Sequence, residues 1–254
     1  MDILKKSLNL TNKNIVLLCL LMIFSLITTV FVSLFKAVTL HVLVLYILMV
    51  VAFFAGFFNV IKTIVQSRRS KLSFLEGVGE YFIPMLGIGM ITFGLYLISA
   101  LIAMRIGMNL AGTKEQVVAA LKELVPLLQA VDSTQLANVN PESAKIYLII
   151  MLAVWLAWSI LSFVILYWIP VLFIDNERNI FKSFYVGIKY LLKTFRKTFL
   201  IYVTTLLLLV LITFLSAIST LFAPALEFVF FVLSYYIAVM FLFAVFLLYE
   251  EKVV

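Results

Sequence analysis

The chain has 254 residues, of which 65% are hydrophobic and 12% charged, and its mean hydropathy is +1.22. Soluble domains are about half apolar and a quarter charged, so a chain of this composition needs lipid to cover part of its surface. The net charge of +7 would suit a nucleic acid or an anionic membrane surface, and the apolar composition favours the membrane. We therefore expect no nucleic-acid partner.

Apolar runs long enough to cross a bilayer, which takes about 20 residues, recur along the whole chain. The first run follows lysines, as in a signal peptide, but it is longer than the apolar core of such a peptide and no small-residue cleavage site follows it. The predicted fold class is all-α, a polytopic transmembrane helical bundle that forms a single integral membrane domain over 1–254. Its six predicted spans are about 15–35, 38–61, 81–104, 146–173, 198–222 and 225–249.

A related short segment precedes each pair of spans. Residues 73–82, SFLEGVGEYF, align with residues 183–192, SFYVGIKYLL, and residues 3–13, ILKKSLNLTNK, are a weaker third copy. The matched residues are Ser73 with Ser183, Phe74 with Phe184, Gly77 with Gly187, and Val78 with Ile188. This pattern predicts three tandem repeats in a parallel arrangement, each an interfacial helix followed by two spans.

The predicted third span contains residues that either break a helix or let helices approach closely. They are Pro84, Gly87, Gly89 and Gly94. A broken helix that exposes backbone carbonyls to a substrate is one interpretation. Close helix packing is the other, and it is favoured because Gly87 and Gly94, seven residues apart, share a helix face.

The extracytoplasmic segment is predicted at about 105–145, between the third and fourth spans. Thr113 and Gln116 form a capping-box pair at the start of a helix, and Asn140 followed by Pro141 marks a second start. The apolar stripe of the first helix consists of Val117, Leu121, Leu124 and Leu128. A lid over a substrate path and a passive cover are both compatible with this pattern.

Basic residues gather on one side of the predicted bundle. An even number of spans puts both termini on one side, and that side holds fourteen of the nineteen basic residues. They are Lys5, Lys6, Lys13, Lys62, Arg68, Arg69, Lys71, Arg178, Lys182, Lys189, Lys193, Arg196, Lys197 and Lys252. By the positive-inside rule this side is the cytoplasm, and the predicted location is the cell (cytoplasmic) membrane with both termini cytoplasmic.

The segment at about 177–197 is predicted to be a cytoplasmic interfacial helix. Its candidate lipid-headgroup contacts are Arg178, Lys182, Lys189, Lys193, Arg196 and Lys197. Their helical spacing places most of them on one face, where they would meet anionic phosphates while the apolar flank enters the lipid. Asp175 or Asn176 is the expected N-cap. The alternative is a solvated loop that only obeys the charge rule.

The sequence lacks the groupings typical of enzymes and metal sites. Its one histidine, His41, and its one cysteine, Cys19, lie in apolar runs far from other ligands. Walker, HExxH, GxSxG and CxxC motifs are missing, and almost no ionisable residue falls in the middle of a span, which disfavours a proton-coupled pump. We expect no enzyme activity, no cofactor, and no catalytic or metal-binding residue.

The stretch 169–203, IPVLFIDNERNIFKSFYVGIKYLLKTFRKTFLIYV, resembles a pattern found in prokaryotic six-helix membrane families, among them the membrane domain associated with glycerophosphoryl diester phosphodiesterases. The corresponding residues are Pro170, Asp175, Glu177, Ser183, Lys193 and Lys197. The resemblance implies a six-helix fold and a membrane location. It carries no catalytic residue across, because the phosphodiesterase chemistry of that family belongs to a separate soluble domain.

Together these features predict a non-enzymatic membrane protein. We expect it to interact with anionic lipid, or to serve as the membrane partner of another protein, of a transport complex or of a second copy of the chain. The alternative is a carrier or permease for an apolar or lipid-like solute. That alternative requires a continuous cavity between the spans, lined by Pro84–Gly94.

Overall fold

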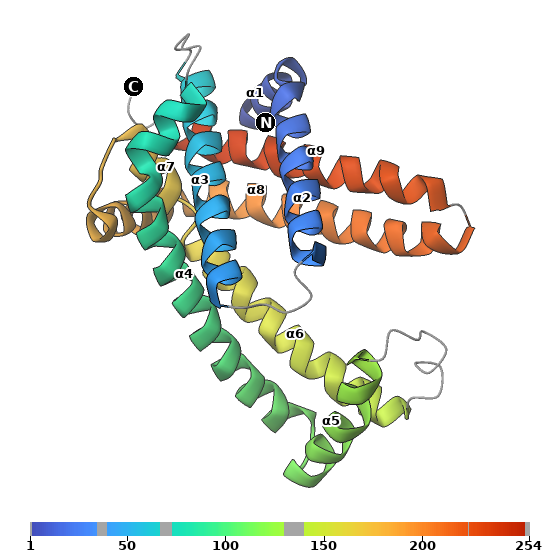
Figure 1. Ribbon diagram of the computed structural model, residues 1–254. Coiled ribbons are helices and arrows are strands. Elements are labelled where there is room, and N and C mark those ends of the chain that lie inside the picture. The colour runs from blue at the N-terminus through green and yellow to red at the C-terminus, as the bar shows by residue number, and fades with distance from the viewer. Residues whose placement is uncertain (1, 35–39, 67–72, 130–139, 223, 252–254) are drawn as a thin grey trace. The chain divides into compact units, whose positions relative to one another are not determined.

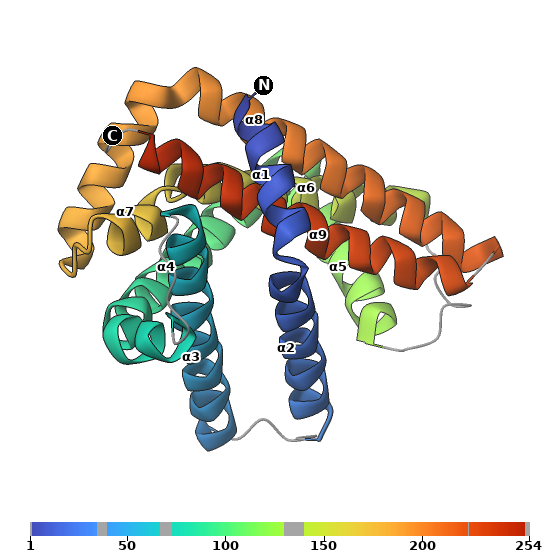
Figure 2. The ribbon, with the colours of Figure 1, turned by 90° about the horizontal axis from the view of Figure 1, so that it is seen from above.

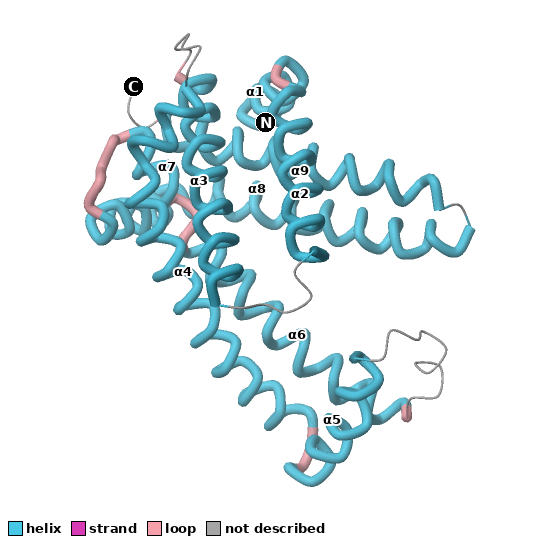
Figure 3. The backbone as a smooth tube through the Cα atoms, viewed as in Figure 1, coloured by secondary structure: helices cyan, strands magenta, loops and turns pink. Residues whose placement is uncertain are grey.

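The structure, a computed structural model, describes residues 2–34, 40–66, 73–129, 140–222 and 224–251. Every regular element in these ranges is an α-helix, as the ribbon in Figure 1 and the tube in Figure 3 show, which confirms the predicted all-α class. In chain order the helices are α1 (Asp2–Lys13), α2 (Ile15–Leu34), α3 (Leu40–Val65), α4 (Ser73–Ala111), α5 (Lys114–Gln129), α6 (Pro141–Val164), α7 (Trp168–Ile174), α8 (Ile180–Phe222) and α9 (Pro224–Glu250).

Six helical stretches of the described chain are long and apolar enough to cross a membrane. Their number and order agree with the predicted spans, and the chain therefore has the architecture of a multi-pass membrane protein. The start expected at residues 38–39 lies outside the described residues. The six stretches are Ile15–Leu34, His41–Val65, Ser73–Ala111, Pro141–Ile174, Ile180–Ser219 and Leu226–Glu250.

Three of these stretches are longer than the sequence predicts. The third begins at Ser73 and the fifth at Ile180, because the segments expected at the headgroups are continuous with the spans that follow them. The predicted interfacial helix 177–197 is thus the first part of α8, and it begins three residues later than expected. The fourth stretch begins at Pro141, where the sequence marks a helix start.

The described residues form two compact units. One consists of Met1–Gly89 and Ile165–Val254, and the other of Met90–Val164. Helix α4 contributes Ser73–Gly89 to the first unit and Met90–Ala111 to the second. The single membrane domain expected over 1–254 stays a prediction, since two packing units within one bilayer are compatible with it.

The core of the first unit lies where α3, α7 and α9 pack against one another. Each helix contributes one buried phenylalanine, namely Phe58, Phe173 and Phe246. The Phe58 ring centroid lies 5.9 Å from that of Phe173 and 6.2 Å from that of Phe246. These distances are typical of favourable aromatic packing, so the three rings hold the three helices together.

Other helices of the first unit pack around this core. Helices α8 and α9 run side by side, and α1 packs against α9 (Figures 1 and 2). Helix α2 meets α3 through Phe24 and Phe53, whose ring centroids are 3.7 Å apart. Many large apolar side chains of α2 and α8, such as Val16, Leu34 and Phe214, are exposed, as expected of surfaces that lipid covers.

The three short segments that the sequence aligns as repeats have a common packing feature. Each buries a pair of small residues four positions apart, and the pairs are Ser7 and Thr11 in α1, Ser73 and Gly77 in α4, and Ser183 and Gly187 in α8. A Cβ atom on Gly77 would lie 2.8 Å from the Ala55 carbonyl oxygen of α3, and one on Gly187 would lie 3.1 Å from the Tyr167 carbonyl carbon. Gly77 and Gly187 thus each let their helix approach the preceding part of the chain closely. The tandem repeats themselves stay a prediction.

The second unit is built from Met90–Ala111 of α4 together with α5 and α6. Its apolar core contains Val117, Ala120, Ile146 and Ile150, with Met108 and Ala111 packed against them. The predicted stripe is confirmed at Val117, and the side chains of Leu121, Leu124 and Leu128 lie outside the described residues. Helix α5 continues beyond Pro126, which therefore does not end it.

Both helix starts predicted in this unit are confirmed. The Thr113 amide donates to Gln116 Oε1 at 2.9 Å and the Gln116 amide donates back to Thr113 Oγ1 at 3.4 Å, which is a capping box. The Glu142 amide donates to Asn140 Oδ1 at 3.0 Å. Glu123 joins the two helices, because its carboxylate accepts hydrogen bonds from the Asn140 amide at 3.0 Å and the Ser143 hydroxyl at 2.6 Å.

Candidate lipid-headgroup interface

The turn between α7 and α8 determines where the basic segment begins. Asn179 Oδ1 accepts hydrogen bonds from the amides of Phe181 and Lys182, both at 3.1 Å, so Asn179 is the N-cap of α8. The sequence prediction of Asp175 or Asn176 as the cap is wrong. Asp175 instead follows the end of α7, and Asn176 has a positive φ of 52°, which asparagine tolerates better than most residues.

Asp175 and Asn176 have different partners, which come from helices distant in sequence. The Tyr249 hydroxyl of α9 donates to Asp175 Oδ2 at 2.5 Å, and the Tyr81 hydroxyl of α4 donates to Asn176 Oδ1 at 3.0 Å. The Lys62 ammonium of α3 donates to the Tyr81 hydroxyl at 2.8 Å. These hydrogen bonds tie the turn directly to α9 and α4, and through Tyr81 to α3.

Two further tyrosines fix α8 on the same core. The Tyr190 hydroxyl donates to the Leu248 carbonyl of α9, and the Tyr167 hydroxyl lies 2.8 Å from Thr198 Oγ1. We call the four buried residues Tyr81, Tyr167, Tyr190 and Tyr249 the tyrosine junction. Tyrosine near the end of a span is typical of a lipid-facing belt, so only the fold reveals that these four side chains point inward.

Residues 180–198 of α8 present three different faces. The face packed on the protein contains Ser183, Gly187, Tyr190, Leu191 and Thr198. One turn of helix takes about 3.6 residues, which places Phe181, Tyr185 and Leu192 together on a second face, where they are 75%, 68% and 70% exposed. The third face carries Lys182, Lys189 and Lys193, and all three are exposed. An apolar flank beside a basic flank is the pattern of a helix at a membrane surface.

The six predicted headgroup contacts divide into two groups. Arg178 pairs with Glu80 at 3.0 Å, and Lys182 pairs with Glu177. The Lys182 hydrogen bond, with help from the Asn179 amide, lowers the pKa of Glu177 and so keeps that carboxylate charged. The other four cations are exposed and form no ion pair with any residue that the structure describes, and they are Lys189, Lys193, Arg196 and Lys197.

A kink lies within the basic part of α8, between Lys193 and Arg196. Thr194 has φ −109° and ψ 15°, outside the helical range, and its hydroxyl donates to the Tyr190 carbonyl at 2.9 Å. Such back-bonding by threonine is a known cause of helix bending. Helix α8 changes direction in Figure 2, and the kink allows the part that ends at Lys193 to lie at an angle to the part that carries Arg196 and Lys197.

Other basic residues of the predicted cytoplasmic side differ in their surroundings. Lys5 and Lys13 of α1 are exposed, and Lys6 pairs with Glu251 at 3.2 Å. Lys62 is half-buried over the Tyr81 ring, with its ammonium 5.1 Å from the ring centroid. Arg68, Arg69, Lys71 and Lys252 lie outside the described residues.

The proline and glycines of the third span do not form one site. Helix α4 is continuous through Pro84, so the structure shows no broken helix there. A Cβ atom on Gly87 would collide with Ile180 Cδ1, which confirms close packing at that residue. At Gly89 and Gly94 a Cβ atom would meet no described atom within 4 Å, so the predicted shared packing face holds for Gly87 alone.

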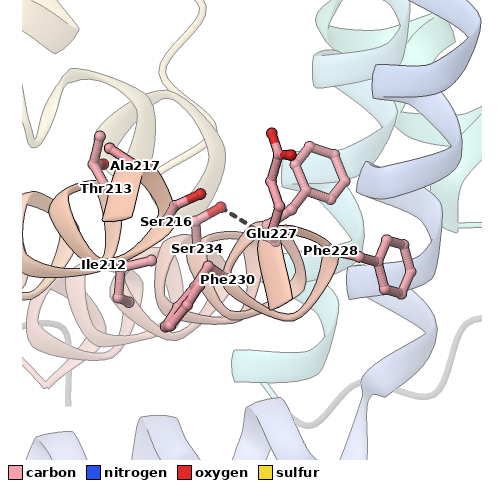
Figure 4. A pocket seen from close by; sticks show the side chains of 9 residues that line it. Ile212, Thr213, Ser216, Ala217, Glu227, Phe228, Phe230 and Ser234 are labelled. Atoms are coloured by element: carbon pink, nitrogen blue, oxygen red, sulfur yellow. Dashed lines mark hydrogen bonds between the residues drawn. The ribbon is translucent and has the colours of Figure 1, made fainter. Parts of the chain in front are cut away.

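The described residues form three notable pockets. One, about 620 Å³, lies between α8 and α9 near Glu227, and Figure 4 shows the Ser216 and Ser234 side chains among those that line it. A second, about 440 Å³, lies between α1 and α8, and a third, about 510 Å³, runs along α1. None of the three is lined by a residue of Pro84–Gly94.

The candidate interface consists of exposed cations and exposed apolar side chains. Cys19 and His41 are both exposed, and no group of three or more His, Cys, Asp or Glu side chains in the described part of the chain is placed to hold a metal ion. Comparison of the chain with known protein families, with curated proteins and with solved structures finds no match.

Proposed function

We propose that this protein is a non-enzymatic multi-pass membrane protein that binds anionic lipid through the basic part of α8. The observation that supports this most strongly is the row of exposed apolar residues Phe181, Tyr185 and Leu192 beside exposed cations that form no ion pair with the described part of the chain. The proposed location is the cell membrane, with both termini on its cytoplasmic side. The resemblance to the phosphodiesterase-associated membrane families is compatible with this function and stays a prediction.

The helical arrangement favours this proposal over a solvated loop. A loop that only obeys the charge rule needs no packed face, yet Ser183 and Gly187 seat this segment firmly on the core. Exposed side chains as large as Phe181 are unfavourable in water and favourable in lipid. Each cation near an anionic surface contributes roughly 1 kcal/mol, so four contribute on the order of 4 kcal/mol at low salt.

The test uses the full chain in lipid nanodiscs of neutral or anionic composition. We expect the melting temperature to be higher in anionic lipid, and this gain to disappear near 1 M salt, where the screening length is about 3 Å. The combined variant Lys189→Ala, Lys193→Ala and Arg196→Ala should lose most of the gain. The matched control, Lys114→Ala, Lys122→Ala and Lys145→Ala, should keep it. A melting temperature that changes neither with lipid charge nor with salt concentration contradicts the proposal.

A carrier for an apolar solute is the second candidate, and the pocket between α8 and α9 is the observation that favours it. The pocket combines hydroxyls with phenylalanine side chains. Two of its hydroxyls already donate to their own helices, Thr213 to the Leu209 carbonyl at 2.9 Å and Ser234 to the Phe231 carbonyl at 2.7 Å. A carrier should bind an apolar fluorescent solute in this pocket, and Ser234→Trp should abolish that binding. Unchanged fluorescence of the bound solute in this variant would argue against the site.

A further inference from the structure

The pocket between α1 and α8 combines a charged end with an apolar wall. On α8 it is lined by Lys197, Leu200, Ile201 and Thr204, whose spacing of three or four residues places them on one face of the helix. Ile3 and Leu4 of α1 form the opposite wall. Both helices belong to the same compact unit, and the N-terminal end of α1 lies beside α8 in Figure 2.

The charges of this pocket are only partly matched within the protein. Lys6 and Glu251 pair with each other at 3.2 Å. Asp2 and Lys197 also line the pocket, and neither forms an ion pair or a hydrogen bond with the residues that the structure describes. One carboxylate and one ammonium are thus left facing the same space without being bonded to each other.

A ligand that carries both charges matches this pattern better than a simple anion does. A phosphate fits the Lys197 ammonium, and an ammonium fits the Asp2 carboxylate, each through a charge-assisted hydrogen bond. Leu200 and Ile201 continue along α8 from Lys197 toward the middle of the span, so an acyl chain would lie against them. A headgroup and an acyl chain in this order describe a phospholipid.

We propose that this pocket binds one phospholipid whose headgroup combines a phosphate diester with a primary ammonium. The phosphate lies at Lys197, the ammonium at Asp2, and an acyl chain lies along Leu200 and Ile201. The proposal rests on the proposed function, since it requires α1 and the basic part of α8 to be at the membrane surface. It adds a selective site for one lipid class to the general attraction of anionic lipid.

The experiment is native mass spectrometry of the full chain, released from mild detergent with equal amounts of phosphatidylethanolamine, phosphatidylglycerol and phosphatidylcholine of identical chains. We expect phosphatidylethanolamine to be retained best, because it alone has both the phosphate and a primary ammonium. Asp2→Asn should reduce its retention about tenfold, to the level of phosphatidylcholine, as expected from the loss of one charge-assisted hydrogen bond. Lys197→Ala should reduce retention of all three lipids at this site.

Each charge variant has a control that makes the same kind of substitution at another exposed residue: Glu115→Gln for Asp2→Asn, and Lys145→Ala for Lys197→Ala. Glu115→Gln and Lys145→Ala change exposed residues of the second unit and should leave retention unchanged. Thr204→Trp keeps every charge and fills the pocket from an exposed position, so it should expel the lipid even if the charge variants fold poorly. Soluble phosphoethanolamine should compete weakly, because it lacks the acyl chain.

Several outcomes overturn the proposal. They are equal retention of phosphatidylethanolamine and phosphatidylcholine by the unmodified protein, unchanged retention in Asp2→Asn and Thr204→Trp, or competition by soluble phosphoethanolamine as strong as that of the lipid. Failure of the proposed function looks different. In that case the melting temperature of the protein in nanodiscs does not depend on lipid charge or salt, even if this pocket selects one lipid class.

Discussion

At the scale of single residues, the close contact at Gly77 is central to the packing of the first unit. A Cβ atom there would collide with the Asn59 Cβ and lie 2.8 Å from the Ala55 carbonyl oxygen. The same part of α4 is held by the Asn59 side-chain amide, which donates to the Ser73 carbonyl at 2.5 Å. Backbone atoms cannot move aside cheaply, so a side chain at Gly77 must push α4 away from α3.

We therefore predict that Gly77→Ala destabilises the protein by about 2 kcal/mol, within the 1–3 kcal/mol typical of overpacking. Gly79→Ala is the matched control, because a Cβ atom on Gly79 meets no described atom within 4 Å. It should be neutral or stabilise by about 0.5–1 kcal/mol, since alanine favours helix over glycine. The measurement is the free energy of unfolding in detergent, and equal values for both variants would refute the packing account.

The hydroxyl of Tyr81 links the Lys62 ammonium to the Asn176 side chain. We predict that Tyr81→Phe lowers the free energy of unfolding by about 1–3 kcal/mol, because the protein loses the hydrogen bonds that the buried Tyr81 hydroxyl makes with the half-buried Lys62 ammonium and the Asn176 side chain. Tyr185→Phe alters an exposed tyrosine of α8 and should change stability by less than about 0.5 kcal/mol. Equal effects of the two substitutions would contradict an inward-facing tyrosine junction.

At the scale of helices, the contact between α5 and α6 depends on the charge of Glu123. Its pKa is lowered, first by the hydrogen bond from the Ser143 hydroxyl and then by the one from the Asn140 amide. A carboxyl group whose pKa is lower in the folded state stabilises the fold above its unfolded pKa of about 4.3. That stabilisation is lost as the pH falls through the lowered pKa.

The expected result is that α5 separates from α6 more readily in acid. Hydrogen exchange of the α5 amides, corrected for the intrinsic effect of pH, should become faster below about pH 4.3 in the unmodified protein. Glu123→Gln should show fast exchange with little dependence on pH, and Glu115→Gln should behave as the unmodified protein does. Exchange that is independent of pH in the unmodified protein would rule out this role for Glu123.

The number and order of the spans could be predicted from the sequence, because an apolar run of about 20 residues is a local signal. The same holds for the caps at Thr113 and Asn140, where partners lie two or three residues away. The cap of α8 is equally local, because Asn179 accepts hydrogen bonds from amides two and three residues further on. The sequence does not show that Tyr249 and Tyr81, distant in sequence, hold Asp175 and Asn176, which are the other candidate caps. Sequence spacing also grouped Gly94 with Gly87, although only Gly87 has a close neighbour in the structure.

At the scale of the whole molecule, the uneven distribution of basic residues between the two predicted sides supports the proposed function. Fourteen of nineteen basic residues fall on the side predicted to be cytoplasmic, a sum that the sequence alone provides once the spans are known. Their roles could not be predicted in this way. The fold shows that Arg178 and Lys182 form ion pairs, while Lys189, Lys193 and Arg196 remain exposed without such partners among the described residues.

The central claim is that the basic part of α8 faces the same side of the membrane as both termini, opposite to α5 and the start of α6. Its most direct test is labelling of single cysteines, introduced into a Cys19→Ala background, with a membrane-impermeant maleimide on sealed cells and on inverted vesicles. We predict that Lys189→Cys reacts only in inverted vesicles and Lys145→Cys only in sealed cells. Reaction of both cysteines from the same side would contradict the account.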